Sequence, residues 1–165
     1  MEELGFPDRH HLLAADGWVD LGNAQEAIRD LARISRAGQR HADVLETRWR
    51  ILAKLSRWPE ALVVACDVVA AAPTRASGWI HRSYTLHELR RTGEALECLL
   101  PAAAQFPDEP IIPYNLACYA CQLGDIAQAK QFLRKAANLR GREAIKQMAQ
   151  HDSDLAPLTE FLGVL

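Results

Sequence analysis

Four alanines spaced 34 residues apart are the feature that most constrains the fold of this chain. Ala27, Ala61, Ala95 and Ala129 stand in one register, and Glu or Gln precedes each of them. Apolar and small residues recur around them at helical spacing, and turn residues such as Gly124-Asp125 interrupt the pattern. A fixed period of this length in a helical pattern is typical of stacked helix-turn-helix units. The sequence therefore predicts an all-α repeat protein.

Close packing between paired helices explains why alanine recurs at this step. We expect each alanine to face the other helix of its own pair, where a larger side chain would overpack the contact. Aromatic and leucine positions such as Trp79 and Leu116 are expected to fill the space between successive pairs. Because no pair can bury its apolar face alone, neighbouring pairs supply the core.

Turn residues and helix-breaking residues divide the chain into helix pairs. The expected helices lie at about 8–21 and 24–36, 42–56 and 59–72, 76–90 and 93–105, and 110–123 and 125–139. Pro101 falls within the helix at 93–105, where it should remove one backbone hydrogen bond and bend the last turn. Asp8 is expected to cap the first helix, and Asp152-Ser153-Asp154 to cap a short last helix ending near Leu162.

The repeated residues resemble the tetratricopeptide repeat family. Its pattern has an aromatic residue, Leu and a small residue in the first helix, Gly in the turn, and Ala, an apolar residue and Ala in the second helix. The last copy carries Leu116, Ala117, Gly124, Ala129, Leu133 and Ala136, and the first copy carries Trp18, Leu21, Gly22, Ala27, Leu31 and Ile34. The resemblance covers roughly residues 8–141 and is carried by four copies without an insertion.

The resemblance implies a fold and a class of function. The fold would be a right-handed α-solenoid forming one domain over residues 1–165, with repeats at about 8–41, 42–75, 76–109 and 110–141. Residues 142–163 would be a C-terminal cap that covers the apolar face of the fourth pair. We expect the inward-facing residues of this cap to be Ala144, Ile145, Met148, Leu155, Leu158, Phe161 and Leu162. The function would be that of a non-catalytic protein-interaction module, an adaptor or scaffold.

Composition narrows the choice of partner and compartment. Lys and Arg number 19 and Asp and Glu 21, so the net charge of −2 argues against a nucleic-acid binder, which needs a basic stripe. No apolar run approaches the 18 residues of a membrane span, and the first residues show no secretory signal. We therefore predict a cytoplasmic protein that binds neither nucleic acid nor membrane. The four cysteines are then expected to be reduced.

The first helices of the pairs are the candidate partner-binding surface, because in this family they line a concave groove. Helical phase places an aromatic and aliphatic patch at one end and charged residues at the other, which suits a peptide ligand. The predicted groove residues are Glu46, Arg50, Lys54, Ile80, Tyr84, His87, Ile111, Tyr114, Asn115 and Gln122. In the alternative interpretation, Tyr84 and Tyr114 merely complete the packing. Self-association through the groove or an exposed end is a further possibility.

A thiol-dependent redox or metal-binding role is the alternative from a different class of function. Cys118 and Cys121 form a CxxC motif on one helix face. A zinc site usually needs a second such pair, and a redox motif usually sits at a helix start after a strand. This sequence has no second pair, and its CxxC motif lies in the middle of an expected helix with no strand before it. No nucleophile elbow, phosphate loop or paired acidic site is found in the sequence. We therefore predict no catalytic residue, no metal and no cofactor.

Overall fold

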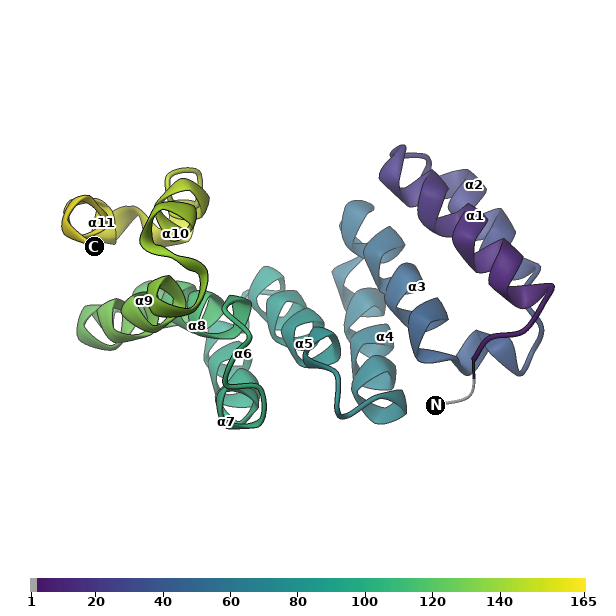
Figure 1. Ribbon diagram of the computed structural model, residues 1–165, viewed down its shortest axis with the longest axis horizontal. Helices are drawn as coiled ribbons and strands as arrows, with labels where there is room; N and C mark the ends of the chain where they lie inside the picture. Colours follow the sequence, from purple (N-terminus) through teal and green to yellow (C-terminus); the bar gives the residue numbers. More distant parts are fainter. Residues whose placement is uncertain (1–2) are drawn as a thin grey trace. The chain divides into compact units, whose positions relative to one another are not determined.

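The computed structural model describes residues 3–165, and within them it contains helices, turns and no strand. The chain divides into two compact units, one ending at His81 and the other beginning at Arg82. Figure 1 shows the helices in chain order. No helix within residues 3–165 is long and apolar enough to cross a membrane.

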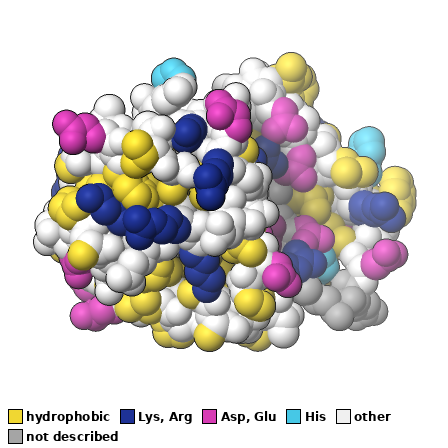
Figure 2. All heavy atoms as spheres, turned by 60° about the vertical axis from the view of Figure 1, so that its left-hand side comes forward, with side chains coloured by type: hydrophobic (Ala, Val, Ile, Leu, Met, Phe, Trp, Pro, Cys, Tyr) yellow, Lys and Arg dark blue, Asp and Glu magenta, His cyan; other side chains and the backbone are white. Residues whose placement is uncertain are grey.

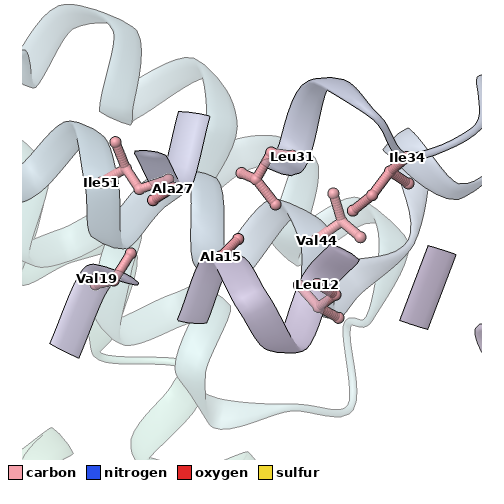
Figure 3. Packing of buried hydrophobic residues seen from close by; sticks show 8 residues of the cluster. All are labelled: Leu12, Ala15, Val19, Ala27, Leu31, Ile34, Val44 and Ile51. Carbon is pink, nitrogen blue, oxygen red and sulfur yellow. The ribbon is translucent and has the colours of Figure 1, made fainter. Parts of the chain in front are cut away.

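The N-terminal unit is built from helix pairs. Its elements are α1 (Asp8–Asp20), α2 (Ala24–Ala32), the 3-10 turn η1 (Gly38–Arg40), α3 (Ala42–Lys54), α4 (Trp58–Ala71) and the first part of α5 (Ala76–Glu88). Helix α1 packs along α2, α3 packs along α4, and α3 also contacts both helices of the first pair. Their shared core is shown in Figure 3, where Leu12, Ala15, Val19, Ala27, Leu31, Ile34, Val44 and Ile51 pack together.

The C-terminal unit continues the pairing and then departs from it. Its elements are the rest of α5, α6 (Thr92–Leu99), α7 (Ala102–Gln105), α8 (Ile111–Gln122), α9 (Ile126–Arg140), α10 (Arg142–Ala149), the 3-10 helix η2 (Ser153–Leu158) and α11 (Thr159–Val164). Helix α8 packs along α9, while α10 lies against α9 and η2 lies against α8.

The 34-residue register is visible in burial. Ala27, Ala61, Ala95 and Ala129 all have 0% exposed surface, as the close approach of paired helices requires. The predicted 34-residue spacing of buried alanines is therefore confirmed.

The same register is visible in the backbone conformation of the turns. Gly22 and Gly124 adopt positive φ angles of 78° and 85° after the first helices of their pairs. The two positions between them at the same step, Ser56 and Arg90, adopt φ angles of 53° and 62°. Left-handed backbone is favourable for glycine and unfavourable for other residues. The turn geometry is thus kept in every copy, including the two in which the sequence has no glycine.

Pro101 breaks its helix where the sequence predicts only a bend. Helix α6 ends at Leu99 and α7 begins at Ala102, with Pro101 at the N-cap of the short second piece. Proline has no backbone N–H to donate, and its ring clashes with the preceding turn of a helix. Helix α6 therefore ends before Pro101, and α7 begins after it.

Three details of the first repeat also differ from the sequence-based expectation. Asp8 is the first residue of α1 and does not cap it; its carboxylate accepts hydrogen bonds from the backbone N–H (2.8 Å) and hydroxyl (2.5 Å) of Ser35. Helix α2 correspondingly ends at Ala32 and does not continue to residue 36. Leu21, which the family pattern matches, is 76% exposed because it lies in the turn after α1.

The C-terminal cap buries its apolar residues against α8 and α9. Ile145, Leu155 and Leu158 are fully buried, and the other predicted inward-facing residues are half-buried. The ring of Phe161 lies 5.4 Å from Lys130 Nζ and 4.9 Å from Arg134 Cζ of α9. Figure 2 shows Lys and Arg side chains next to hydrophobic ones on the face that it turns forward.

Candidate functional site

A cleft in the C-terminal unit, called the C-terminal cleft, is the main candidate site. It has a volume of about 590 Å³ and is lined by polar and aromatic side chains. Its walls come from the end of α5, from α8, and from the turn between α10 and η2. The lining residues are Tyr84, His87, Glu88, Arg90, Tyr114, Met148 and His151–Asp154.

Asp152 holds the turn between α10 and η2 against α8. Its Oδ2 atom accepts a hydrogen bond from the Tyr114 hydroxyl (2.8 Å) and another from the Cys118 thiol (3.4 Å). Its Oδ1 atom accepts from the backbone N–H of Asp154 (3.0 Å), so the same carboxylate caps η2 as the sequence predicts. One side chain therefore both starts the last helices and attaches them to α8.

Asp154 makes a second attachment, this time reaching α5. His87 Nε2 lies 2.8 Å from Asp154 Oδ2, and His87 Nδ1 lies 3.0 Å from the Thr92 hydroxyl. Because a carboxylate can only accept, Nε2 carries the donated proton. The backbone carbonyl of Asp154 also accepts from Gln122 Nε2 (3.3 Å). Residues of two first helices thus converge on a three-residue segment of the chain's own C-terminus.

Burial and negative charge shape the acidity of the groups in this cleft. Burial raises the pKa of Tyr84 to about 12, and its hydrogen bond with Glu88 and the charges of Asp152 and Asp154 add to the shift. The pKa of Tyr114 is raised chiefly by burial and then by its hydrogen bond to Asp152. Both phenols therefore remain neutral hydrogen-bond donors at physiological pH.

The two predicted aromatic anchors differ in accessibility. Tyr84 is 37% exposed in the cleft, whereas only 6% of Tyr114 is exposed. The packing interpretation therefore fits Tyr114 as it stands in this structure, since its side chain is buried and its hydroxyl donates to Asp152. Tyr84 keeps the surface that a partner could contact.

The charged residues predicted for the groove make contacts within the N-terminal unit. Arg50 bonds to Asp16 (2.9 Å) and Asp20 (2.5 Å), linking α3 to α1. Lys54 Nζ donates to the Val19 carbonyl (2.7 Å). These contacts tie neighbouring first helices to one another.

Glu46 is engaged in the same way. It accepts a hydrogen bond from the Ser77 hydroxyl (2.7 Å), and its Oε1 atom lies 3.7 Å from Arg75. Arg75 in turn pairs with Asp43. A partner that binds these charged groups must replace contacts they already have.

The remaining predicted groove residues are half-buried and less informative. Ile111 and Asn115 lie on α8, and Ile80 lies on α5. Ile80 belongs to the unit that ends at His81, so its proximity to Ile111 and the two tyrosines stays a prediction.

The environment of the CxxC motif is unlike that of a reactive thiol. Cys118 and Cys121 are buried, and burial is the largest cause that raises the pKa of each, with Asp152 and Asp154 adding to it. Redox-active cysteines have lowered pKa values, so the shift has the opposite sign. Within residues 3–165, no group of three or more His, Cys, Asp and Glu side chains is placed to hold a metal ion.

Sequence reasoning missed the acidic contribution of Asp152 and Asp154 to the cleft. Their pattern in the sequence indicates only capping, a role that Asp152 also fulfils. A usable signal is present: two carboxylates separated by one residue and followed directly by an apolar residue, Leu155. What the sequence could not show is that this turn folds back onto α8 and α5.

Comparison with solved structures identifies the fold. The comparison with family models finds no match, and neither does that with curated proteins. PilF of Pseudomonas aeruginosa has 20% identity and a TM-score of 0.76, covering 94% of this chain and 70% of that one. A thermophilic tetratricopeptide-repeat protein of Thermus thermophilus has 19% identity and a TM-score of 0.73, covering 95% of each chain.

A further similar structure is YrrB, described as a tetratricopeptide-repeat protein with an unusual peptide-binding site. It has 19% identity and a TM-score of 0.72, covering 87% of this chain and 74% of that one. These likenesses confirm the fold predicted from the repeat: the chain has the tetratricopeptide-repeat fold.

Proposed function

We propose that this chain is a non-catalytic protein-interaction module that binds a segment of a partner protein in its C-terminal cleft. The observation that carries the proposal is the partly exposed side chain of Tyr84 inside a cleft that is also lined by Glu88 and Arg90. An accessible aromatic anchor beside adaptable polar groups is the arrangement that peptide and protein recognition uses most.

The fold supports this proposal without specifying the partner. Stacked helix pairs present side chains of successive first helices on one continuous surface, which suits an extended or helical segment. YrrB, a protein of similar fold, is described as having a peptide-binding site. We extend the same class of ligand to this chain.

Composition supports the remaining parts of the proposal. A net charge of −2 disfavours nucleic acid as the partner, and we place the protein in the cytoplasm. The raised pKa of the Cys118 thiol removes the main support for a redox role. A protein or peptide thus remains the ligand class that the residues favour.

Affinity capture from the native cell, followed by identification of the bound proteins, tests the proposal. Tyr84→Ala removes the accessible anchor, and we expect it to lose the specific partner at unchanged helicity. Leu123→Ala is the matched control, because Leu123 is an exposed apolar residue that does not line the cleft. If the Tyr84→Ala variant keeps every partner of the unaltered protein, the cleft is not the binding surface.

A further inference from the structure

The segment Asp152–Leu155 lies against the cleft in the way a bound peptide would. Two carboxylates accept hydrogen bonds from α8 and α5 at 2.8 Å each, and the carbonyl of Asp154 accepts from Gln122. Leu155, the next residue, is fully buried. The segment thus makes polar contacts through Asp152 and Asp154 and one buried apolar contact through Leu155.

We propose that Asp152–Leu155 is an internal ligand of the C-terminal cleft, and that the partner presents an acidic segment of the same pattern, Asp-x-Asp-Leu, which binds by displacing it. This inference rests on the proposed function and specifies both its partner class and its regulation. The chain in this structure is then the closed form.

The donors that face the segment select for carboxylates. Tyr114 and Cys118 converge on a single oxygen of Asp152, and His87 donates to Asp154. An ionised carboxylate offers acceptors only, so it satisfies all three donors without a misplaced proton. A side-chain amide has one accepting oxygen and no charge, so its hydrogen bonds to the same donors would be weaker.

The segment is held by hydrogen bonds from Tyr114, His87 and Gln122 and by the buried side chain of Leu155, so a ligand that displaces it must supply equivalent contacts. The segment belongs to a 3-10 helix, whose hydrogen bonds are less favourable than those of an α-helix. Helix α11, which follows it, contains no buried residue within Thr159–Val164.

Charge in the cleft makes the internal and external segments compete. Asp152, Asp154 and Glu88 together line the cleft beside the exposed ring of Tyr84. An acidic peptide would be repelled while these carboxylates are in place, because like charges at close range are unfavourable. After displacement of Asp152 and Asp154 it would find their donors available. Binding and release of the internal segment are therefore coupled.

Fluorescence anisotropy with a labelled synthetic peptide of residues 150–160 tests the proposal on the full-length protein. The double substitution Asp152→Asn and Asp154→Asn weakens the internal segment but keeps Leu155 and Leu158, and Asn still caps a helix. We expect this variant to bind the peptide at least about tenfold more tightly than the unaltered protein, since each lost charge-assisted hydrogen bond is worth about a factor of ten or more.

Two controls test whether the cleft recognises the carboxylates of the peptide. A peptide in which both Asp residues are replaced by Asn should lose at least about tenfold in affinity for the double variant. Adding His87→Phe, which keeps a ring but removes the donor, to the double variant should weaken binding of the acidic peptide. Equal binding of the acidic and Asn peptides, or no binding to the double variant, would overturn the proposal.

A second measurement covers the case in which the double variant does not fold, as judged by its circular dichroism. Hydrogen exchange on the unaltered protein should then show amides of residues 153–158 exchanging at least about tenfold faster than those of α8. Equal protection would contradict a displaceable segment.

If the peptide fails to bind while Tyr84-dependent capture of a partner persists, this inference falls and the proposed function stands. If capture itself does not depend on Tyr84, the proposed function falls.

Discussion

Tyr114 and Asp152 are joined by a 2.8 Å hydrogen bond that connects the middle of the chain to its last helices. The phenol is almost completely buried, and the carboxylate also starts η2. Removal of either partner would leave the other as a buried polar group without this hydrogen bond. The cost of leaving it unsatisfied is larger than the net contribution of the hydrogen bond to stability. The coupling free energy of this pair therefore measures how strongly the C-terminal segment is attached to α8.

A double-mutant cycle on this pair gives the first prediction. Tyr114→Phe should lower the free energy of unfolding by about 1.5–3 kcal/mol, because it removes a hydrogen bond to a charged group. In combination with Asp152→Asn the loss should be smaller than the sum of the single losses, with a coupling of about 1 kcal/mol or more in urea unfolding. Tyr119→Phe is the control, since Tyr119 donates to Ser83 (3.2 Å) and not to Asp152. Additive losses for Tyr114 would contradict a direct contact.

Ser56 gives a stabilising prediction. Its φ angle of 53° is unfavourable for a residue with a β-carbon, and glycine occupies the equivalent turn position at Gly22 and Gly124. Ser56→Gly should therefore raise the free energy of unfolding by about 0.5–1 kcal/mol. The control is Cys66→Gly on the exposed face of α4, which should lower stability by up to about 0.5 kcal/mol. A loss of stability with Ser56→Gly would exclude backbone strain at this turn.

The helix pairs could be predicted from the sequence because they depend on local and periodic information. The 34-residue spacing fixes which alanines face a partner helix, and burial of Ala95 and Ala129 confirms it. The ends of elements were less predictable because they depend on distant residues. Helix α2 stops early where Ser35 meets Asp8, a contact between residues 27 apart.

The candidate site could be predicted only in part, for the same reason. Helical phase selects the side of α8 that carries Tyr114 and Gln122. It cannot show which of these side chains another segment covers, because that depends on how residues 150–158 fold back. Helical phase places both Tyr84 and Tyr114 on the predicted groove, yet Tyr84 stays exposed and Tyr114 does not.

Overpacking at the paired helices gives a third prediction. Ala129→Leu should lower the free energy of unfolding by about 1–3 kcal/mol, since Ala129 has no exposed surface and a larger side chain must displace its neighbours. Ala127→Leu on the exposed side of the same helix, α9, is the matched control and should change stability by less than about 0.5 kcal/mol. Equal melting of both variants would show that the helix register is wrong.

Thiol reactivity gives a fourth prediction. Cys66 is exposed, whereas Cys118 is buried and has a raised pKa because of burial and the nearby Asp152. Titration of the native protein with a thiol-specific reagent at about pH 8 should therefore label Cys66 at least about tenfold faster than Cys118, as measured by peptide mass spectrometry. The difference should vanish in denaturant. Fast native labelling of Cys118 would restore the redox interpretation.

The stacking of His81 on Trp49 gives a prediction about pH. The two rings lie 3.7 Å apart between centroids and are nearly parallel at 9°, and burial followed by the charge of Arg50 lowers the pKa of His81 from 6.5 to about 4. A lowered folded-state pKa means that the unfolded chain takes up the proton first as the pH falls. The stability associated with neutral His81 is therefore complete above about pH 6.5 and is lost as the pH falls towards about 4, by on the order of 3 kcal/mol. His81→Phe keeps a ring on Trp49 but cannot titrate, so its free energy of unfolding should fall less over the same pH range. Urea unfolding of both proteins across this range measures the difference, and parallel curves would mean that His81 does not titrate in the buried stack.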